Sequence, residues 1–346
     1  MANTTEHQFP NQSINNLNKS VLVVGGAGYI GSHISKHLIR NGYTPVIVDR
    51  NVKNNPIAKQ FTDVYEMDLP KDIHLIDDLI KRYNIDSCIC TAAYTSVPES
   101  VKEPMKYYQN NVVMTLQLLN KLKDLDVKKF IFSSSAAVYG IIKNGVCFDD
   151  SIGLEPINPY GQTKLAMEKI LKEYNTAYGI NSISFRYFNA AGADPEGEVG
   201  ELREEETHII PLAINAARQG SKFKMFGDQY ATDDGTCVRD YVHVMDLADA
   251  HIKALNYATQ NKTSEVFNLG SGAPASNKEL LEAVQKHTGK MNISIEPNRP
   301  GDPAYLVADI NKAKEILDWE PTQSDIDNVV ATAVQWYNKT HKKEIQ

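Results

Sequence analysis

The sequence predicts an α/β protein, with a Rossmann-like doubly wound parallel sheet followed by a smaller mixed α/β domain. Three observations favour this fold class. Short apolar runs alternate with helix-compatible segments from Ser20 to about residue 188, as expected when helices cover both faces of a parallel sheet. Glycines at positions 25, 28 and 31 follow the first apolar run. Beyond about residue 190 the alternation weakens and the apolar runs become shorter.

The first domain is expected over residues 20–188, after a flexible polar arm at residues 1–19. Its strands are expected where β-branched and apolar residues cluster between turn residues, at Val21–Val24, Thr44–Asp49, Asp63–Asp68, Asp86–Thr91, Lys128–Ser133 and Ser182–Arg186. Helices are expected between the strands, at Ser32–Arg40, Asp72–Tyr83, residues 103–124 and Tyr160–Tyr178. The crossovers between successive parallel strands should be right-handed.

The second domain is expected over residues 189–346, with segments around 236–270 returning to the first domain. Shorter strands are predicted at Phe223–Phe226, Val242–Val244, Val266–Leu269 and Ile293–Ile295. The segment 192–206 is rich in Gly and Glu, which indicates a surface loop.

Composition limits the function classes. The chain has 346 residues, of which 42% are hydrophobic, so it can bury a sizeable core. Its 36 basic and 43 acidic residues give a net charge of −7, which argues against non-specific binding of nucleic acid or of anionic membranes. We find no membrane-spanning run, no signal-peptide pattern and no metal-ligand spacing among the four cysteines, and therefore expect a cytoplasmic protein without a metal.

The three glycines predict a dinucleotide site. Gly25, Gly28 and Gly31 lie between an apolar strand and a helix, where they permit a tight turn, close approach of the backbone to a pyrophosphate, and close packing of helix on strand. Asp49 ends the second strand, 18 residues after Gly31, where a carboxylate would bind the adenosine ribose and repel a 2′-phosphate. This favours NAD over NADP, although Arg50 could accept that phosphate. Asp68 ends the third strand and either contacts the adenine edge or is a loop acid before Pro70.

A Tyr-x-x-x-Lys pair predicts redox chemistry at a hydroxyl. Tyr160 and Lys164 open a helix and share one of its faces, because they are four residues apart. A free phenol has a pKa of about 10, so two nearby cations, the Lys164 ammonium and an oxidised nicotinamide, are needed to favour the phenolate. Ser133 to Ser135 end a predicted strand at the carboxyl edge of the sheet, where a hydroxyl can bind a substrate oxygen and relay its proton.

Together, these motifs resemble the extended short-chain dehydrogenase/reductase family, which includes NAD-dependent epimerases and dehydratases, and within it the nucleotide-sugar 4-epimerases. The resemblance runs from about Val21 to about Trp336 and is carried by Val24–His33, Phe132–Gly140, Pro159–Lys164, Arg186–Asn189 and Tyr230–Asp246. It implies interconversion of UDP-glucose and UDP-galactose by inversion at C4 through a transient 4-keto sugar, with NAD as reversible hydride acceptor. It also implies a homodimer, since relatives pair through the helices that match 103–124 and 160–178.

The resemblance assigns roles residue by residue. Tyr160, Lys164 and Ser135 take the catalytic positions. The implied NAD-binding residues are Gly25, Gly28, Tyr29, Ile30, Gly31, Asp49, Asn51, Asp68, Leu69, Ala92, Ala93, Asn110, Ser133, Tyr160, Lys164 and Tyr187. The implied residues for the UDP-hexose are Ser135, Tyr160, Asn189, His208, Phe226, Arg239, Arg299 and Asp302. Among them the two arginines would clamp the pyrophosphate, because guanidinium groups suit phosphates.

Other functions stay open. A 4-epimerase of UDP-N-acetylhexosamines, alone or as a second activity, is the alternative within the class. A UDP-glucuronate 4-epimerase is less favoured, although Arg203 or His208 could pair with a C6 carboxylate. A 4,6-dehydratase would carry an Asp-Glu pair where this chain has Ala136 and Ala137. A non-catalytic NAD sensor is a different class and would usually lack the Tyr/Lys pair.

Overall fold

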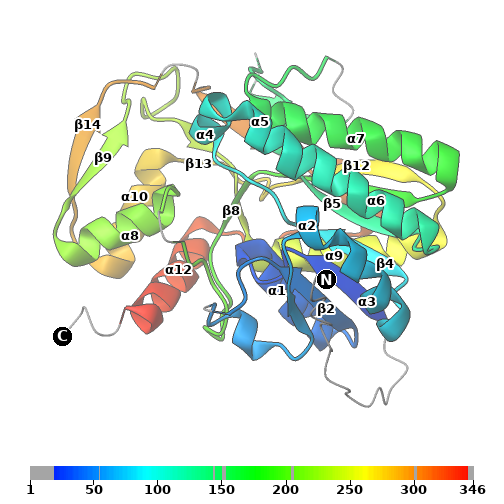
Figure 1. Ribbon diagram of the computed structural model, residues 1–346. Coiled ribbons are helices and arrows are strands. Elements are labelled where there is room, and N and C mark those ends of the chain that lie inside the picture. The colour runs from blue at the N-terminus through cyan, green and yellow to red at the C-terminus, as the bar shows by residue number, and fades with distance from the viewer. Residues whose placement is uncertain are drawn as a thin grey trace.

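The computed structural model describes residues 19–53, 55–142, 145–149, 153–203, 206–299 and 302–341, so the predicted arm lies almost entirely outside the described residues. Its larger part is a seven-stranded sheet with the strand order β12-β7-β5-β4-β1-β2-β3, and every ladder in it is parallel (Figure 1). The strands are β1 (Ser20–Val24), β2 (Thr44–Asp49), β3 (Val64–Glu66), β4 (Ser87–Cys90), β5 (Lys129–Ser135), β7 (Asn181–Tyr187) and β12 (Ser264–Leu269). The predicted strands of this sheet are confirmed, with bounds that differ by two residues or fewer.

The alternation of side chains along each strand divides the core into two layers. Val21 and Val23 of β1 belong to one buried cluster, whereas Leu22 and Val24 belong to the other. The first layer includes residues of α1 (Tyr29–Arg40), α9 (Val244–Gln260) and α11 (Asn311–Leu317). The second includes residues of α3 (Ile76–Tyr83), α6 (Met114–Asp124) and α7 (Pro159–Tyr178). The sheet is therefore buried on both faces, which is the reason that its strands are apolar throughout.

Two predicted helices are interrupted. The helical part of residues 103–124 starts at Pro104, because Glu103 has a non-helical φ of −125°, and it comprises α5 (Pro104–Tyr107), a π-helical stretch (Tyr108–Val113) and α6. The segment predicted as one helix from Asp72 to Tyr83 begins earlier, as α2 (Leu69–Asp72), and passes through a 3₁₀ turn (Ile73–Leu75) into α3. Pro70 lies in the first turn of α2, where its missing N–H costs nothing.

The second lobe stands at the left of Figure 1, where α8 (Ile209–Gln219), α10 (Asn277–Thr288) and α12 (Ile326–Thr340) pack beside the parallel pair β9 (Lys222–Phe226) and β14 (Asn292–Glu296). Two small sheets complete it. One has the order β13-β10-β15-β6, and the other pairs β11 with β8. Their strands are β13 (Ala275–Ser276), β10 (Val238–Arg239), β15 (Tyr305–Ala308), β6 (Val146–Cys147), β11 (Tyr241–His243) and β8 (Asn189–Ala191). The strand predicted at Val242–Val244 ends at His243, because Val244 begins α9.

The Gly- and Glu-rich segment after β8 is irregular, as predicted, but it is a surface loop only in part: Glu196 and Glu198 are exposed, whereas other residues are buried. Ala193, Asp194 and Val199 are each at most 1% exposed. Ala193 and Val199 pack with Trp336 of α12, and the Asp194 carboxylate accepts a hydrogen bond of 2.6 Å from Lys36 of α1. The composition of the segment does not reveal this burial, because the partner that neutralises Asp194 is Lys36, which is distant in sequence. Within the described residues, no helix is both long and apolar enough to span a bilayer.

Candidate active site

The turn between β1 and α1 requires its glycines. Gly25 has a φ of +81°, and a Cβ atom there would lie 2.6 Å from the backbone nitrogen of Ala92. A Cβ on Gly31 would lie 2.2 Å from the carbonyl oxygen of Gly25. Gly28 caps α1 without a side chain, so the first N–H groups of the helix stay open to a ligand. These contacts match the three tasks that the spacing predicts: a tight turn, close approach and close packing.

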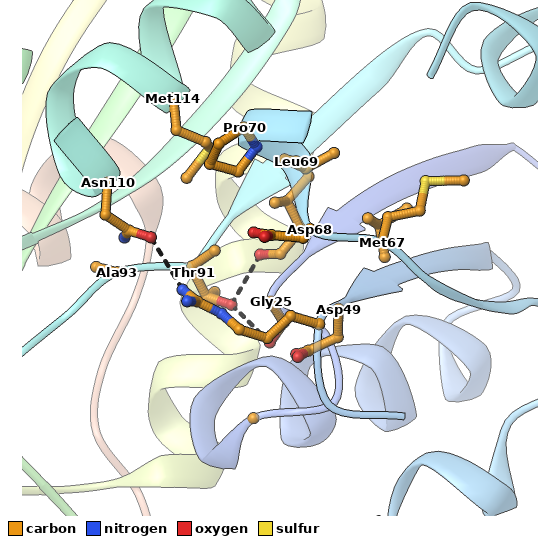
Figure 2. A pocket seen from close by; sticks show the side chains of 15 residues that line it. Gly25, Asp49, Met67, Asp68, Leu69, Pro70, Thr91, Ala93, Asn110 and Met114 are labelled. Atoms are coloured by element: carbon orange, nitrogen blue, oxygen red, sulfur yellow. Dashed lines mark hydrogen bonds between the residues drawn. The ribbon is translucent and has the colours of Figure 1, made fainter. Parts of the chain in front are cut away.

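A cavity opens at the carboxyl ends of β1, β2 and β4 (Figure 2), lined by Val24, Gly25, Gly28, Val48, Asp49, Arg50, Met67, Asp68, Leu69, Pro70, Thr91, Ala92, Ala93, Asn110 and Met114. Half of the predicted NAD-binding residues are in its wall. Thr91, at the end of β4, was missed by the sequence analysis. Its hydroxyl hydrogen-bonds to the carbonyl oxygens of Val24 and Gly25, both at 3.1 Å, and so holds the glycine turn in place.

Asp49 lies at the rim of this cavity beside the glycine turn. Its two carboxylate oxygens accept hydrogen bonds from the backbone N–H groups of Ala27 and Asn51, each at 3.1 Å. Burial nevertheless raises the pKa of Asp49 above its ordinary value, because the charged form loses solvation. The carboxylate is thus fixed in direction. Asn51, a predicted NAD-binding residue, takes part in this arrangement through its backbone N–H group.

Asn110 reaches the cavity from the π-helix, and its side chain is buried. Its amide nitrogen donates to Oδ1 of Asn111 at 2.9 Å, and its amide oxygen accepts a hydrogen bond of 2.9 Å from Arg50, drawn as a dashed line in Figure 2. Asn111 is buried as well and donates to Thr163 of α7 at 3.2 Å. The wider π-helical turn therefore connects the cavity wall to the helix that carries Tyr160 and Lys164.

Tyr160, Ser135 and Lys164 meet where β5 ends and α7 begins. Burial has the largest effect on the Tyr160 phenol and raises its pKa. A hydrogen bond with the Ser135 hydroxyl and the charge of Arg203 both lower this pKa. The Lys164 ammonium is buried and donates to the carbonyl oxygen of Ser133 at 2.6 Å. Burial lowers the pKa of Lys164 to about 8. In the chain alone, the phenol is therefore neutral at pH 7.

Ser133 and Tyr187 form a buried chain of hydroxyl groups under this site. The two oxygens are 2.9 Å apart, and Tyr187 also lies 2.8 Å from Nε2 of His251. Burial lowers the pKa of His251 to about 4, so the ring is neutral at pH 7. Ser133 and Tyr187 are thus placed behind Lys164, rather than in the wall of the cavity.

Tyr29 and Ile30 also lie outside the cavity wall. The Tyr29 hydroxyl donates to the carbonyl oxygen of Gly192 at 2.7 Å and so connects the first turn of α1 to the segment after β8. Ile30 packs against the apolar core. The charge of Arg203 lowers the pKa of Tyr160, a role that was not predicted from the sequence, where Arg203 was expected only as a possible partner for a carboxylated sugar.

The structure brings some of the predicted UDP-sugar residues together on the second lobe. The guanidinium carbon of Arg299 lies 3.9 Å from the centroid of the Phe226 ring, and Asp302 donates its backbone N–H to Arg299 at 3.3 Å. Arg239 on β10 donates to the carbonyl oxygen of Pro303 at 2.8 Å, next to Asp302. This group, Phe226, Arg239, Arg299 and Asp302, combines an aromatic face with two guanidinium groups.

Two further residues of the predicted substrate set have protein partners. Asn189 on β8 donates to the carbonyl oxygen of Asp240 at 2.9 Å. His208 is exposed, and its Nδ1 lies 2.8 Å from Oε1 of Glu201, an oxygen that also accepts from Arg203 at 2.6 Å. Arg203 and His208, the two candidate partners for a C6 carboxylate, are therefore both already paired with Glu201.

The cavity fits a dinucleotide by the chemistry of its wall. Glycines 25 and 28 leave the backbone accessible at the N-terminus of α1, which suits phosphate groups. Asp49, with both oxygens already accepting from backbone N–H groups, is oriented to accept from ribose hydroxyls as well.

Comparison with known proteins gives concordant matches. A model described as the NAD dependent epimerase/dehydratase family matches residues 21–270. The UDP-glucose 4-epimerase of Lactobacillus helveticus is 46% identical over 330 residues, which are 93% of this chain and 98% of that protein. The crystal structure of the Brucella ovis UDP-glucose 4-epimerase in complex with NAD has a TM-score of 0.87 at 39% identity, covering 92% of this chain and 98% of that one. The Bifidobacterium longum UDP-glucose 4-epimerase in complex with NAD⁺ and UDP has a TM-score of 0.84 at 34% identity, covering 94% and 99%.

Proposed function

The chain belongs to the NAD-dependent epimerase/dehydratase family, and we propose that it interconverts UDP-glucose and UDP-galactose by inversion at C4, with NAD as its cofactor. The observation that carries this proposal is the meeting of Tyr160, Ser135 and Lys164 beside the glycine-lined cavity. An isomerase of this kind needs a base at the sugar hydroxyl, a dinucleotide within reach, and an anchor for the UDP group.

Tyr160 is the base that takes the proton of the sugar's 4-hydroxyl, and it returns the proton at the end of the reaction. Ser135, hydrogen-bonded to the phenol, orients the same hydroxyl and can relay its proton. NAD, once bound, would supply positive charge to this site and the reversible uptake of the C4 hydride, which would leave the sugar as a transient 4-ketone. Because burial holds the Tyr160 pKa high, this added positive charge is what favours the phenolate.

Lys164 holds the nicotinamide ribose and supports the phenolate through its charge. Its carbonyl partner on Ser133 fixes the ammonium on the β5 side of α7. The wall residues Gly25, Gly28, Asp49, Asp68, Leu69, Ala92, Ala93 and Asn110 hold the rest of the dinucleotide, and Tyr29, Ile30, Gly31, Asn51 and Tyr187 support this wall from behind.

The UDP group is anchored on the second lobe. Phe226 stacks on the uracil, Arg239 and Arg299 pair with the pyrophosphate, and Asp302 binds the uridine ribose, while Asn189 and His208 lie toward the sugar. An anchor at the UDP end leaves the hexose free to turn and present either face to the same nicotinamide. In support, the Arg239 guanidinium group donates to the carbonyl oxygen of Pro303, and the Arg299 guanidinium group lies over the Phe226 ring. A NAD-binding domain at 20–188 and a mainly UDP-sugar-binding domain at 189–346, with segments around 236–270 returning to the first, would follow the same separation of tasks.

We also propose a cytoplasmic homodimer. Val97, Val101 and Met105 are 39%, 62% and 69% exposed on α4 (Val97–Lys102) and α5, and Tyr108 and Val113 extend the same exposed apolar stretch along the π-helix. Exposed apolar side chains of this number on neighbouring turns favour a protein partner, and a second copy is consistent with the helix pairing expected from the sequence. Size-exclusion chromatography with light scattering tests it: a monomer at micromolar concentration would contradict the proposal.

The function is tested by incubating the purified protein with UDP-galactose, without any added reductant or oxidant, and following the anomeric signals by proton NMR. We expect UDP-glucose to appear until an equilibrium mixture is reached. A parallel incubation with UDP-N-acetylgalactosamine reports the alternative activity. An unchanged UDP-galactose spectrum from protein that carries NAD would rule out the proposed reaction.

A further inference from the structure

We propose that Arg50 is a cofactor-binding residue, whose guanidinium group spans the dinucleotide cavity and pairs with the pyrophosphate of NAD. The inference rests on the proposed function only in taking NAD as the ligand of this cavity. Arg50 is the first residue after β2 and follows directly on Asp49. Its side chain is therefore attached on the adenosine-ribose side of the site.

The guanidinium group reaches the other wall. Nη1 of Arg50 donates to the Tyr94 hydroxyl at 2.6 Å, and Nη2 donates to the amide oxygen of Asn110 at 2.9 Å. The guanidinium carbon also lies 4.7 Å from the centroid of the Tyr94 ring. Because Arg50 and Asn110 both line the cavity, the side chain crosses the space between the end of β2 and the π-helix.

Tyr94 is a rigid anchor for this contact. Its backbone N–H donates to Oδ1 of Asn111 at 2.9 Å, and its carbonyl oxygen accepts from Nδ2 of the same residue at 3.0 Å. The ammonium of Lys106 lies 4.5 Å from the centroid of the Tyr94 ring. With its anchor fixed before the ligand arrives, the guanidinium group loses little further freedom on binding.

The charges of the wall favour an anion at Arg50. Among the residues that line the cavity, Asp49 and Asp68 are acidic and Arg50 alone is basic. The two hydrogen bonds of its guanidinium group go to a phenol and an amide, which are neutral, so its charge is left for a ligand. The pyrophosphate of a dinucleotide carries two negative charges; Asp68 is paired with Lys71, so without Arg50 the pyrophosphate would face the Asp49 carboxylate with no basic residue in the wall.

The same geometry argues against a 2′-phosphate as the ligand of Arg50. A 2′-phosphate would lie at the ribose, next to the Asp49 carboxylate, whereas the guanidinium group is held at Tyr94 and Asn110. Asp49 takes hydrogen bonds from backbone N–H groups, those of Ala27 and Asn51 among them, whereas the hydrogen bonds of the Arg50 guanidinium group go to Tyr94 and Asn110. On the sequence alone, Arg50 could have accepted the 2′-phosphate of NADP. The contacts with Tyr94 and Asn110 instead direct its guanidinium group toward the pyrophosphate.

The test uses the protein as purified with NAD and measures the rate at which bound NAD is released into excess unlabelled NAD. We expect R50Q to release NAD about tenfold faster or more, the size expected for loss of one charge-assisted hydrogen bond to phosphate, and R50K to lie between R50Q and the wild type. The control is R218Q, which removes the same charge from the exposed end of α8 and should leave the rate unchanged.

Salt dependence and a second variant distinguish an ion pair between Arg50 and the pyrophosphate from a structural role of the Arg50–Tyr94 contact. Raising NaCl from about 0.05 M to about 0.5 M should accelerate release from the wild type and much less from R50Q, because salt screens the pair that R50Q lacks. Y94F keeps the charge and should have a smaller effect than R50Q. Two results would overturn the assignment of Arg50 while leaving the proposed function intact. One is an R50Q variant that releases NAD at the wild-type rate; the other is an equal acceleration in Y94F and R50Q with unchanged salt dependence. A wild-type protein that neither carries nor binds NAD would overturn the proposed function with it.

Discussion

The ammonium nitrogen of Lys164 lies 5.8 Å from the centroid of the Tyr160 ring, one helical turn further along α7. Both side chains are buried, and burial acts on them in opposite senses: it raises the pKa of the phenol and lowers that of the ammonium to about 8. Each shift disfavours the charged form that the proposed mechanism uses. The site is therefore incomplete as an acid–base device until a further cation enters it.

Tyr160→Phe tests the base directly. The substitution removes the phenolic oxygen but keeps the ring in a site where it is 9% exposed, so the fold should be unchanged. We expect the rate of UDP-galactose conversion to fall by about a hundredfold or more, the range for loss of a general base, while UDP and NAD still bind. The rate is measured with a coupled assay, and binding by calorimetry. Near-wild-type turnover would remove Tyr160 from this role.

Asp49→Asn tests the cofactor preference. An asparagine can still accept from the backbone N–H of Ala27 through its oxygen, but it no longer repels a phosphate. We expect NAD to bind more weakly and NADP to gain relative to it, so the ratio of the two dissociation constants should move toward one. D124N, at the C-terminal end of α6, is the matched control. An unchanged ratio in D49N would exclude the carboxylate as the selecting group.

The ion pair of Glu168 and Arg186 tests how much of the site's support is electrostatic. The two side chains are 5% and 4% exposed, the oxygen–nitrogen distance is 2.7 Å, and Ser134 donates to the same carboxylate at 2.5 Å. Glu168→Ala leaves a buried guanidinium unpaired and should lower the free energy of unfolding by roughly 3–5 kcal/mol. Urea unfolding measures this. The double variant E168M/R186M should recover part of the loss, and failure to do so would show that packing, not charge, dominates here.

The buried histidine behind Tyr187 predicts a pH dependence of stability. Burial lowers the pKa of His251 to about 4 from its usual 6.5, so the unfolded chain takes up a proton as the pH falls through 6.5 while the folded chain does not. This contribution to stability is complete above pH 6.5 and is lost as the pH falls toward 4. We expect the urea midpoint to drop between about pH 7 and about pH 5, and to drop less in His251→Gln.

The matched control is His74→Gln, because His74 is exposed on the 3₁₀ turn before α3. Its midpoint should follow the wild type at both pH values. An equally steep decline in the His251 and His74 variants would assign the acid sensitivity to other groups.

The sequence alone was sufficient for the sheet and for the chemistry of its edge. Apolar runs predict strands well when both faces are buried, since nothing polar interrupts them. The turn at Gly25, Gly28 and Gly31 and the helix that starts beside Tyr160 depend on local sterics and on spacing along one helix, both of which are written in neighbouring residues. For this reason the strands of the large sheet, among them the run at Val266–Leu269, were predicted within a few residues.

Other features depended on partners distant in the chain. The π-helix at Tyr108–Val113 interrupts a segment whose composition suits one α-helix. Part of the segment after β8 is buried because Lys36 and Trp336 contact it, which its glycines and acids do not reveal. Similarly, Arg239 contacts the carbonyl oxygen of Pro303, 64 residues further along the chain, which no local pattern indicates.

The sequence by itself determined which residue types are available: a phenol, an ammonium, a glycine turn and an acid at the end of β2. Only the tertiary structure decided what each of them faces. Arg50 is ambiguous in the sequence, because its long side chain can point toward either phosphate position. The hydrogen bonds to Tyr94 and Asn110, made 44 and 60 residues away, decide the direction, since a flexible cation goes where fixed acceptors lie.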